Sequence, residues 1–364
     1  MNEPKHPHHH DTLNSPATSE LPASPETKTA SAPKKKTSFR LKLLVALVAL
    51  LLPFIATLAF LLPLPIEETK TVIIPHGISV QEIAATLQNN GVPLNIYMFR
   101  LAAKILANNS LKAGEYQCQP RQSLAEIVFM MNQGRAIVRL FTVPEGLTSH
   151  EIVKLLQDDL TLSGNIKTVP PEGSLLPESY RYIYGDNRAN LVERMQKSQR
   201  ELLNDLWAKR DPDVPLKTPQ EAVTMASIIE KETGKKAEER ARVAGVFYNR
   251  LRQGMRLQSD PTVIYALTKG QKALSRELTH NDMAIASPYN TYMNYGLPPG
   301  PISNPGRASL EAALHPEKNA FLYFVTDGKG GHAFAKDLIA HNKNINHWLN
   351  PPKKTPVPKQ KPKS

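Results

Sequence analysis

Residues 218–233, TPQEAVTMASIIEKET, carry the strongest local folding signal in the chain. Thr218 and Glu221 have the spacing of a capping box, and Pro219 stands at the first helical position, so a helix is predicted to begin here. Its apolar residues recur at helical spacing and predict one buried face, formed by Ala222, Met225, Ala226 and Ile229. The sequence therefore predicts an amphipathic helix that packs against the core of a globular domain.

Two glutamates near the end of this helix differ in their predicted surroundings. Glu230 falls beside Ala226 and Ile229 at the rim of the apolar face, whereas Glu232 is rotated by roughly 200° from that rim, towards solvent. A carboxyl group packed against apolar side chains loses hydration in its charged form, so Glu230 is a candidate general acid. The alternative is an ordinary surface glutamate paired with a nearby basic residue. The basic candidates are Lys231, Arg240 and Arg250.

Four loops after this helix are dense in proline, glycine and polar residues. They read QSDPT at 258–262, SPYNTY at 287–292, GLPPGPI at 296–302 and NPG at 304–306. Loops of this kind hold side chains in place, and tyrosine faces with asparagine amides suit recognition of a polar polymer such as a sugar chain. Structural turns explain the proline and glycine equally well, but explain the Tyr-Asn-Thr-Tyr cluster less easily.

Residues 70–118 predict a strand, two helices and a second strand. Residues 70–75 are rich in β-branched side chains and residues 111–118 also read as extended, while Ser79 and Asn95 are candidate caps of the two helices. The first helix begins with a pattern that resembles a LysM-like module: Ile74-Pro75-x-Gly77-x-Ser79-x-x-Glu82-Ile83-x-x-x-Leu87. In its families this small βααβ unit binds cell-wall glycan.

Residues 144–157 repeat the pattern of residues 75–88. The repeat extends from a Pro-x-Gly turn through a capping box into an amphipathic helix, so we expect the local structure to recur. A weaker copy begins at Ser123, and a capping box before an amphipathic helix is enough to explain it.

Residues 43–64 form an uncharged apolar stretch. As a helix it would be about 33 Å long, which is enough to cross a hydrocarbon core of about 30 Å. A cleaved signal peptide is the weaker alternative, because its apolar region is usually only about 7–15 residues long and is followed by a small-residue cleavage site. Basic residues precede the stretch and Glu67 and Glu68 follow it, so the positive-inside rule predicts a cytoplasmic N-terminus with residues 65–364 outside.

The formal net charge of +12 is spread along the chain, and its densest basic runs flank the apolar stretch and end the chain. Without interleaved aromatic residues this pattern does not predict nucleic-acid binding. Cys118 is the sole cysteine, so no intrachain disulfide is expected.

Several ordered motifs together resemble the endolytic murein transglycosylase family, which is YceG-like. They are ASIIEKET at 226–233, RLQSDPTV at 256–263, YNTY at 289–292, GLPPGPI at 296–302 and Gly331-His332-x-Phe334. The likeness extends from the apolar stretch to about Leu349, and Glu172-Gly173 also resembles part of a family motif.

The resemblance implies cleavage of peptidoglycan glycan strands without a cofactor or metal. The first glutamate of the family's Glu-Lys-Glu motif is catalytic, and it falls on Glu230. By this resemblance Glu230 protonates the oxygen between MurNAc and GlcNAc, and its carboxylate then deprotonates the MurNAc C6 hydroxyl to leave 1,6-anhydroMurNAc. The residues expected to position the glycan are Gln258, Asp260, Asn290, Tyr292 and Asn304.

Three alternatives stay open. A muramidase would use water as the nucleophile, with Asp260 or Glu232 as a second carboxylate. A wall-binding scaffold would be indifferent to Glu230→Gln. A metallohydrolase would need histidine ligands, but the histidines downstream of the helix lack a spacing such as His-x-x-x-His and are expected to be structural or to face the substrate. These histidines are His280, His315, His332 and His341.

The sequence thus predicts an α+β protein of the inner membrane that crosses it once. Its predicted parts are a disordered cytoplasmic tail at 1–42, a transmembrane helix at 43–64, a LysM-like module at 65–137, a mixed α+β periplasmic catalytic domain at 138–350 and a disordered Lys/Pro tail at 351–364. A tethered domain reaches only glycan near the membrane, so we expect it to act on nascent strands beside peptidoglycan synthases.

Overall fold

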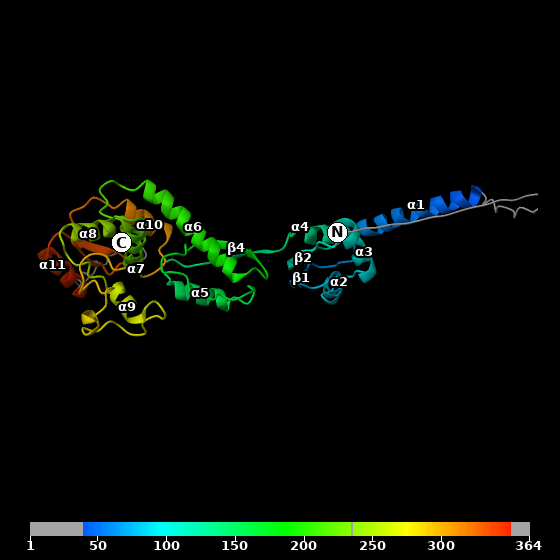
Figure 1. The fold of residues 1–364 in the computed structure, drawn as a ribbon. Coiled ribbons are helices and arrows are strands. Elements are labelled where there is room, and N and C mark those ends of the chain that lie inside the picture. The colour runs from blue at the N-terminus through cyan, green and yellow to red at the C-terminus, as the bar shows by residue number, and fades with distance from the viewer. Residues whose placement is uncertain (1–38, 234–235, 351–364) are drawn as a thin grey trace, which may run out of the picture. The chain divides into compact units, whose positions relative to one another are not determined.

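The computed structural model describes residues 39–233 and 236–350. Over these residues the chain combines α-helices with three two-stranded antiparallel sheets (Figure 1), which confirms the predicted α+β class. All of the predicted tail at 351–364 and most of the one at 1–42 lie outside the described residues.

The first helix in the described part of the chain is α1 (Phe39–Leu61). Its residues 41–61 are apolar and long enough to cross a membrane, judged by length and composition. The predicted apolar stretch ends three residues later than this helix. Pro63 has no backbone N–H with which to continue α1, and it instead forms an isolated bridge with Ser123.

The first α/β group is β1 (Lys70–Ile74), α2 (Val80–Asn89), α3 (Ile96–Ala107), β2 (Gly114–Cys118) and α4 (Leu124–Gln133). The predicted order of strand, helix, helix and strand is confirmed, and Ser79 and Asn95 cap the two helices as expected. β1 and β2 pair in antiparallel register with Val72 opposite Tyr116, and both side chains are fully buried. The three helices and the inward faces of the strands share one apolar core.

The second group is β3 (Val138–Thr142), α5 (Ser149–Asp158), β4 (Ser179–Ile183) and α6 (Arg188–Ala208). Its first strand and helix repeat β1 and α2, as predicted. In both copies a glycine in the left-handed region turns the chain, Gly77 at φ +82° and Gly146 at φ +76°. A capping box then starts each helix. The weaker copy, from Ser123, has the capping box of α4.

The third group is α7 (Pro219–Glu232), η1 (Ala237–Glu239), α8 (Arg240–Arg252), α9 (Asp260–Thr268), η2 (Asp282–Ala284), α10 (Arg307–Leu314), β5 (Tyr323–Thr326), β6 (His332–Ala335) and α11 (Leu338–Leu349). α7 packs against α8 and α10 around the largest apolar core (Figure 1). The β5–β6 hairpin adds Phe324 and Phe334 to the edge of this core.

α7 is buried on every side, so the prediction of a single buried face is wrong. Residues 222–230 are all buried, including the polar Thr224 and Ser227. Their hydroxyls donate to backbone carbonyls of their own helix, which lets these positions lie inside the core without unpaired polar groups.

The start of α7 agrees with the sequence in its main contact and differs in one detail. Thr218 Oγ1 accepts a hydrogen bond from the Glu221 N–H at 3.2 Å, as an N-cap should. The Glu221 carboxylate instead accepts from the Lys217 N–H at 2.6 Å, so the reciprocal half of the predicted capping box is displaced by one residue.

We expect Thr218→Ala to lower the free energy of unfolding by about 1 kcal/mol, because the first turn of α7 loses its cap. Thr218→Ser keeps the hydroxyl and should lose much less. Urea denaturation of both variants beside the wild type measures the difference. Equal losses for Ala and Ser would show that packing of the threonine methyl group, and not the cap, stabilises this end.

Candidate active site

The prediction that Glu232 faces solvent is wrong. Glu232 is the last residue of α7, and it is partly buried. Its Oε1 accepts a hydrogen bond from Ser259 Oγ at 2.5 Å. The segment that precedes α9 and the β5–β6 hairpin contribute residues to the walls around this carboxyl. The spacing of residues along one helix cannot predict this burial, because the residues that surround Glu232 come from segments distant in the sequence.

A cavity of about 250 Å³ lies beside Glu232. Its walls come from α7, α8, the segment before α9 and the β5–β6 hairpin. Its polar lining consists of Glu232, Arg250, Gln258, Asp260, Thr326 and His332. Carboxyl, amide, hydroxyl and imidazole groups therefore converge on one small space, which makes this cavity the candidate active site.

Burial raises the pKa of the Glu232 carboxyl to about 7. The Ser259 hydroxyl lowers the pKa by hydrogen bonding to the charged form, the Asp260 charge raises it, and the Arg250 charge lowers it. A carboxyl with this pKa is protonated in a large fraction of molecules at neutral pH. Glu232 can therefore donate a proton there, the property first expected of Glu230.

Ser259 stands at the N-cap of α9 but makes no side-chain cap. A serine in this position usually accepts a hydrogen bond from the first turn of its helix. Here its hydroxyl donates to Glu232, while its backbone N–H donates to Thr291 Oγ1 at 3.0 Å. The serine side chain is thus committed to the carboxyl group and not to the helix that it precedes.

Three of the five residues predicted to position a glycan lie around the cavity. Gln258 and Asp260 line it with exposed side chains, and Tyr292 donates its hydroxyl to Asp260 Oδ1 at 2.6 Å. Gln258 lies in the left-handed region at φ +49°, a conformation that non-glycine residues rarely adopt. Such strain is often found at functional sites, where it holds a side chain in a required direction.

The other two, Asn290 and Asn304, are fully buried and do not face the cavity. The Asn290 amide donates to two backbone carbonyls, those of Met283 and Ile285, each at 2.9 Å. The Asn304 amide donates to Glu172 Oε1 at 3.0 Å and accepts from the Leu175 N–H at 2.9 Å. With their polar atoms already bonded inside the protein, both hold loops in place and do not offer a direct glycan contact.

Glu230 is buried as predicted, but it lies away from this cavity. Its Oε2 accepts from the Gly306 N–H at 2.9 Å and its Oε1 accepts from Arg240 Nη2 at 3.3 Å. The pairing with Arg240 was one of the predicted alternatives, although both side chains are largely buried and not at the surface. Glu230 therefore joins α7 to the starts of α8 and α10.

Glu145 and Glu172 complete the framework around Glu230. Neither was predicted as a site residue, although Glu172 belongs to a stretch that resembles a family motif. Glu145 shares Arg240 with Glu230, at 3.5 Å, and its pKa is raised by burial and by the Glu230 charge. Glu172 accepts from the Ser149 N–H at 2.8 Å, and burial raises its pKa. Glu145 occupies the variable position of the repeated Pro-x-Gly turn. The repeat therefore predicted that Glu145 lies in a turn, but it did not predict the ion pair with Arg240.

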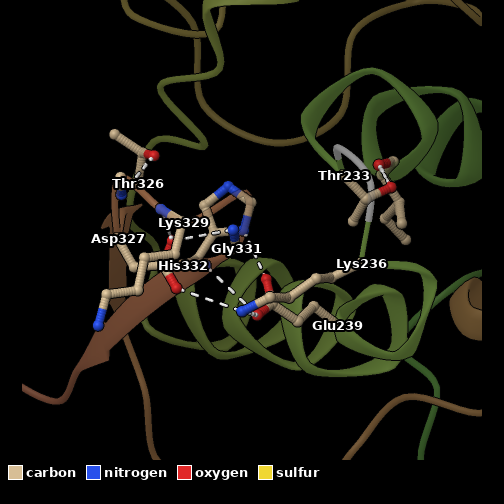
Figure 2. Close-up of polar contacts among 10 residues, drawn as sticks. Thr233, Lys236, Glu239, Thr326, Asp327, Lys329, Gly331 and His332 are labelled. Carbon is tan, nitrogen blue, oxygen red and sulfur yellow. Dashed lines mark hydrogen bonds and ion pairs between the residues drawn. The ribbon is translucent and has the colours of Figure 1, made fainter.

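The hairpin tip beside the cavity is bound to η1 by a polar network (Figure 2). His332 Nδ1 lies 2.8 Å from Glu239 Oε2, and Lys236 Nζ lies 3.2 Å from Asp327 Oδ2. Gly331 fits between them because it has no side chain: a Cβ there would lie 2.6 Å from Glu239 Oε1. This network holds one wall of the cavity against the beginning of α8.

The histidines considered as metal ligands lie in separate surroundings. His315 pairs with Asp211, His332 with Glu239, and His341 stacks on Tyr323, while His280 is exposed. Within residues 39–233 and 236–350, no three His, Cys, Asp or Glu side chains are grouped to hold a metal ion.

The chain is similar to known proteins of one family. A model of the YceG-like family matches residues 72–347. An endolytic murein transglycosylase of Bacillus subtilis (strain 168) is 32% identical over 323 residues, 79% of this chain and 88% of that protein. One of Streptococcus pneumoniae (strain D39) is 30% identical over 337 residues, 80% of this chain but 60% of the longer relative.

A crystal structure of a yceG-like protein of Listeria monocytogenes, lmo1499, is 34% identical and covers 76% of this chain and 99% of that chain, with a TM-score of 0.45. The family match includes every residue of the cavity and of the Glu230 framework. This chain belongs to the YceG-like family.

Proposed function

We propose that this chain is a membrane-anchored endolytic lytic transglycosylase. It cleaves MurNAc-β-1,4-GlcNAc bonds within peptidoglycan strands and leaves 1,6-anhydroMurNAc ends. The observation that carries the proposal is the Glu232 carboxyl, with a pKa of about 7, in a cavity lined by Gln258 and Asp260. The relatives named endolytic murein transglycosylases support the same reaction.

We assign the proton donor to Glu232 and not to Glu230. Both oxygens of Glu230 already have partners inside the protein, the Arg240 guanidinium and the Gly306 N–H, and Glu230 is not among the residues that line the cavity with Gln258 and Asp260. Glu232 has one hydroxyl partner and lines that cavity. Its surroundings favour the protonated form that a general acid needs.

The reaction needs two proton transfers. Glu232 protonates the departing glycosidic oxygen, and the MurNAc C6 hydroxyl loses a proton as its oxygen bonds to C1. A single carboxyl can perform both transfers in turn, as expected above for Glu230, or a second group in the cavity can accept the C6 proton. Closure by C6 consumes no water, whereas a muramidase would use water and leave a reducing end.

The N-terminal parts suit work on new wall material. α1 serves as a single anchor in the inner membrane, with the catalytic domain on the periplasmic side. The βααβ unit around β1 and β2 serves as a LysM-like glycan-binding module. Because the anchor limits reach, the substrates are nascent strands close to the peptidoglycan synthases.

Glu232→Gln should reduce strand cleavage by at least about 100-fold, because the amide cannot donate a proton to the leaving oxygen as an acid does. Glu230→Gln should keep cleavage within about tenfold of the wild type and lower the stability of the fold by about 1–3 kcal/mol. Mass spectrometry of digested strands and thermal melting measure the two effects. A folded Glu230→Gln without activity beside an active Glu232→Gln would return the role to Glu230.

The pH dependence follows from the direction of the Glu232 shift. A general acid must be protonated, so kcat/KM should fall as pH rises through about 7 and should approach a tenfold loss for each further unit. Ser259→Ala removes a hydrogen bond that lowers the pKa, so the falling limb should move to higher pH. Initial rates of both proteins across this range test it. A limb that stays in place in Ser259→Ala would assign the titration to another group.

Release from the membrane should weaken the effect on strand length in cells. A periplasmic form that begins after α1, matched to the full chain in abundance, should restore glycan strand length less completely than the anchored form. Chromatography of glycan strands from the two complemented strains makes the comparison. Equal restoration would show that proximity to the membrane does not select the substrate.

A further inference from the structure

His332 lines the cavity that contains Glu232 and is held there by a buried carboxylate. Its Nδ1 lies 2.8 Å from Glu239 Oε2, and its backbone N–H donates to Glu239 Oε1 at 3.3 Å. One carboxylate thus contacts the ring and the backbone of the same residue (Figure 2). The ring also packs edge-on against Phe324, with 5.2 Å between centroids. These contacts leave the imidazole little freedom to rotate.

The Glu239 contact also determines how the ring is protonated. An ionised carboxylate only accepts hydrogen bonds, so the proton of the neutral ring resides on Nδ1. Nε2 then carries a lone pair. Since Nδ1 is occupied by Glu239, Nε2 is the nitrogen left for a group inside the cavity.

Glu239 is itself fixed in place. Its side chain is buried at the junction of η1 and α8, with Lys236 Nζ 3.9 Å away. Lys236 also contacts Asp327 in the turn of the hairpin. The close approach at Gly331 leaves no room for a side chain between the turn and η1. The carboxylate that orients His332 is therefore anchored on both sides, as an orienting group in a catalytic pair must be.

We propose that His332 is the general base of the reaction. As the C6 oxygen of MurNAc bonds to C1, its proton passes to His332 Nε2, while Glu232 gives its own proton to the departing oxygen and the C1–O bond breaks. Glu232 is left as a carboxylate and His332 as an imidazolium beside Glu239. Transfer of a proton from His332 to Glu232, directly or through water, restores both groups. This inference rests on the proposed function.

The surroundings of Glu232 and His332 suit two different roles, an acid and a base. The acid must hold a proton at the start of the reaction and the base must not. In the cavity these two needs fall on two different groups, a carboxyl group bonded to a serine hydroxyl and an imidazole whose Nδ1 is bonded to a carboxylate. A single carboxyl would have to lose its first proton before it could accept the second.

His332→Ala in the full chain is expected to slow the formation of 1,6-anhydroMurNAc ends by about 100-fold or more, the usual worth of a general base. Added imidazole fits the space left by the ring and should restore at least about a tenth of the lost rate. Imidazole should have no effect on Glu232→Gln, which lacks the acid. His280→Ala is the matched control, because His280 is exposed and does not line the cavity. Strand binding and thermal melting establish that the variants are folded.

Wild-type rates in His332→Ala would overturn the proposal, and so would a folded, strand-binding His332→Ala that imidazole does not rescue. Should His332→Ala fail to fold, Glu239→Gln takes its place: the ring remains but loses its orienting charge, so a loss of about tenfold or more in kcat with an unchanged KM is expected, and an unchanged kcat would count against the proposal. If the wild type itself makes reducing ends or does not cleave, the proposed function fails, independently of His332.

Discussion

The enclosure of α7 is the constraint on which the structure around the cavity depends. Residues 222–230 of this helix are all buried, and the two carboxyl groups at its end, Glu230 and Glu232, take partners inside the protein, whereas Lys231 between them is exposed. Glu230 obtains a guanidinium and a backbone N–H, whereas Glu232 obtains a serine hydroxyl and a cavity. The first set of partners makes a structural ion pair. The second leaves a carboxyl group whose pKa of about 7 keeps it protonated in a large fraction of molecules near neutral pH.

Buried asparagine side chains in the loops also form their hydrogen bonds inside the protein. Asn304 connects the loop before α10 to Glu172 and to the segment before β4, which lie more than a hundred residues earlier in the chain. Asn290 fixes the turn that presents Tyr292 to Asp260. These amides do not approach the cavity, yet the positions of the residues that do approach it depend on them. Much of the polar content of the proline-rich loops therefore serves to hold the site.

Three further segments complete the site. α8 contributes Arg250, whose guanidinium donates to the backbone carbonyls of Leu257 and Leu322 and so connects both remaining walls. The hairpin contributes His332, and η1 contributes the carboxylate that orients it. Since each wall is tied to another by a hydrogen bond or an ion pair, the carboxyl and the imidazole are held at fixed positions without a metal ion in the proposed mechanism.

Local order was determined by the sequence itself. The caps at Ser79, Asn95 and Thr218, the βααβ order and the repeat at Gly146 follow from interactions within a few residues, and all are present in the structure. Motif spacing likewise located the segments that carry Gln258, Asp260 and Tyr292. The identity of the carboxyl group that faces the cavity depends instead on long-range packing. The surroundings of Glu232 come from Ser259, Arg250 and the β5–β6 hairpin, and the sequence of one helix contains no information about neighbours that the fold brings from elsewhere.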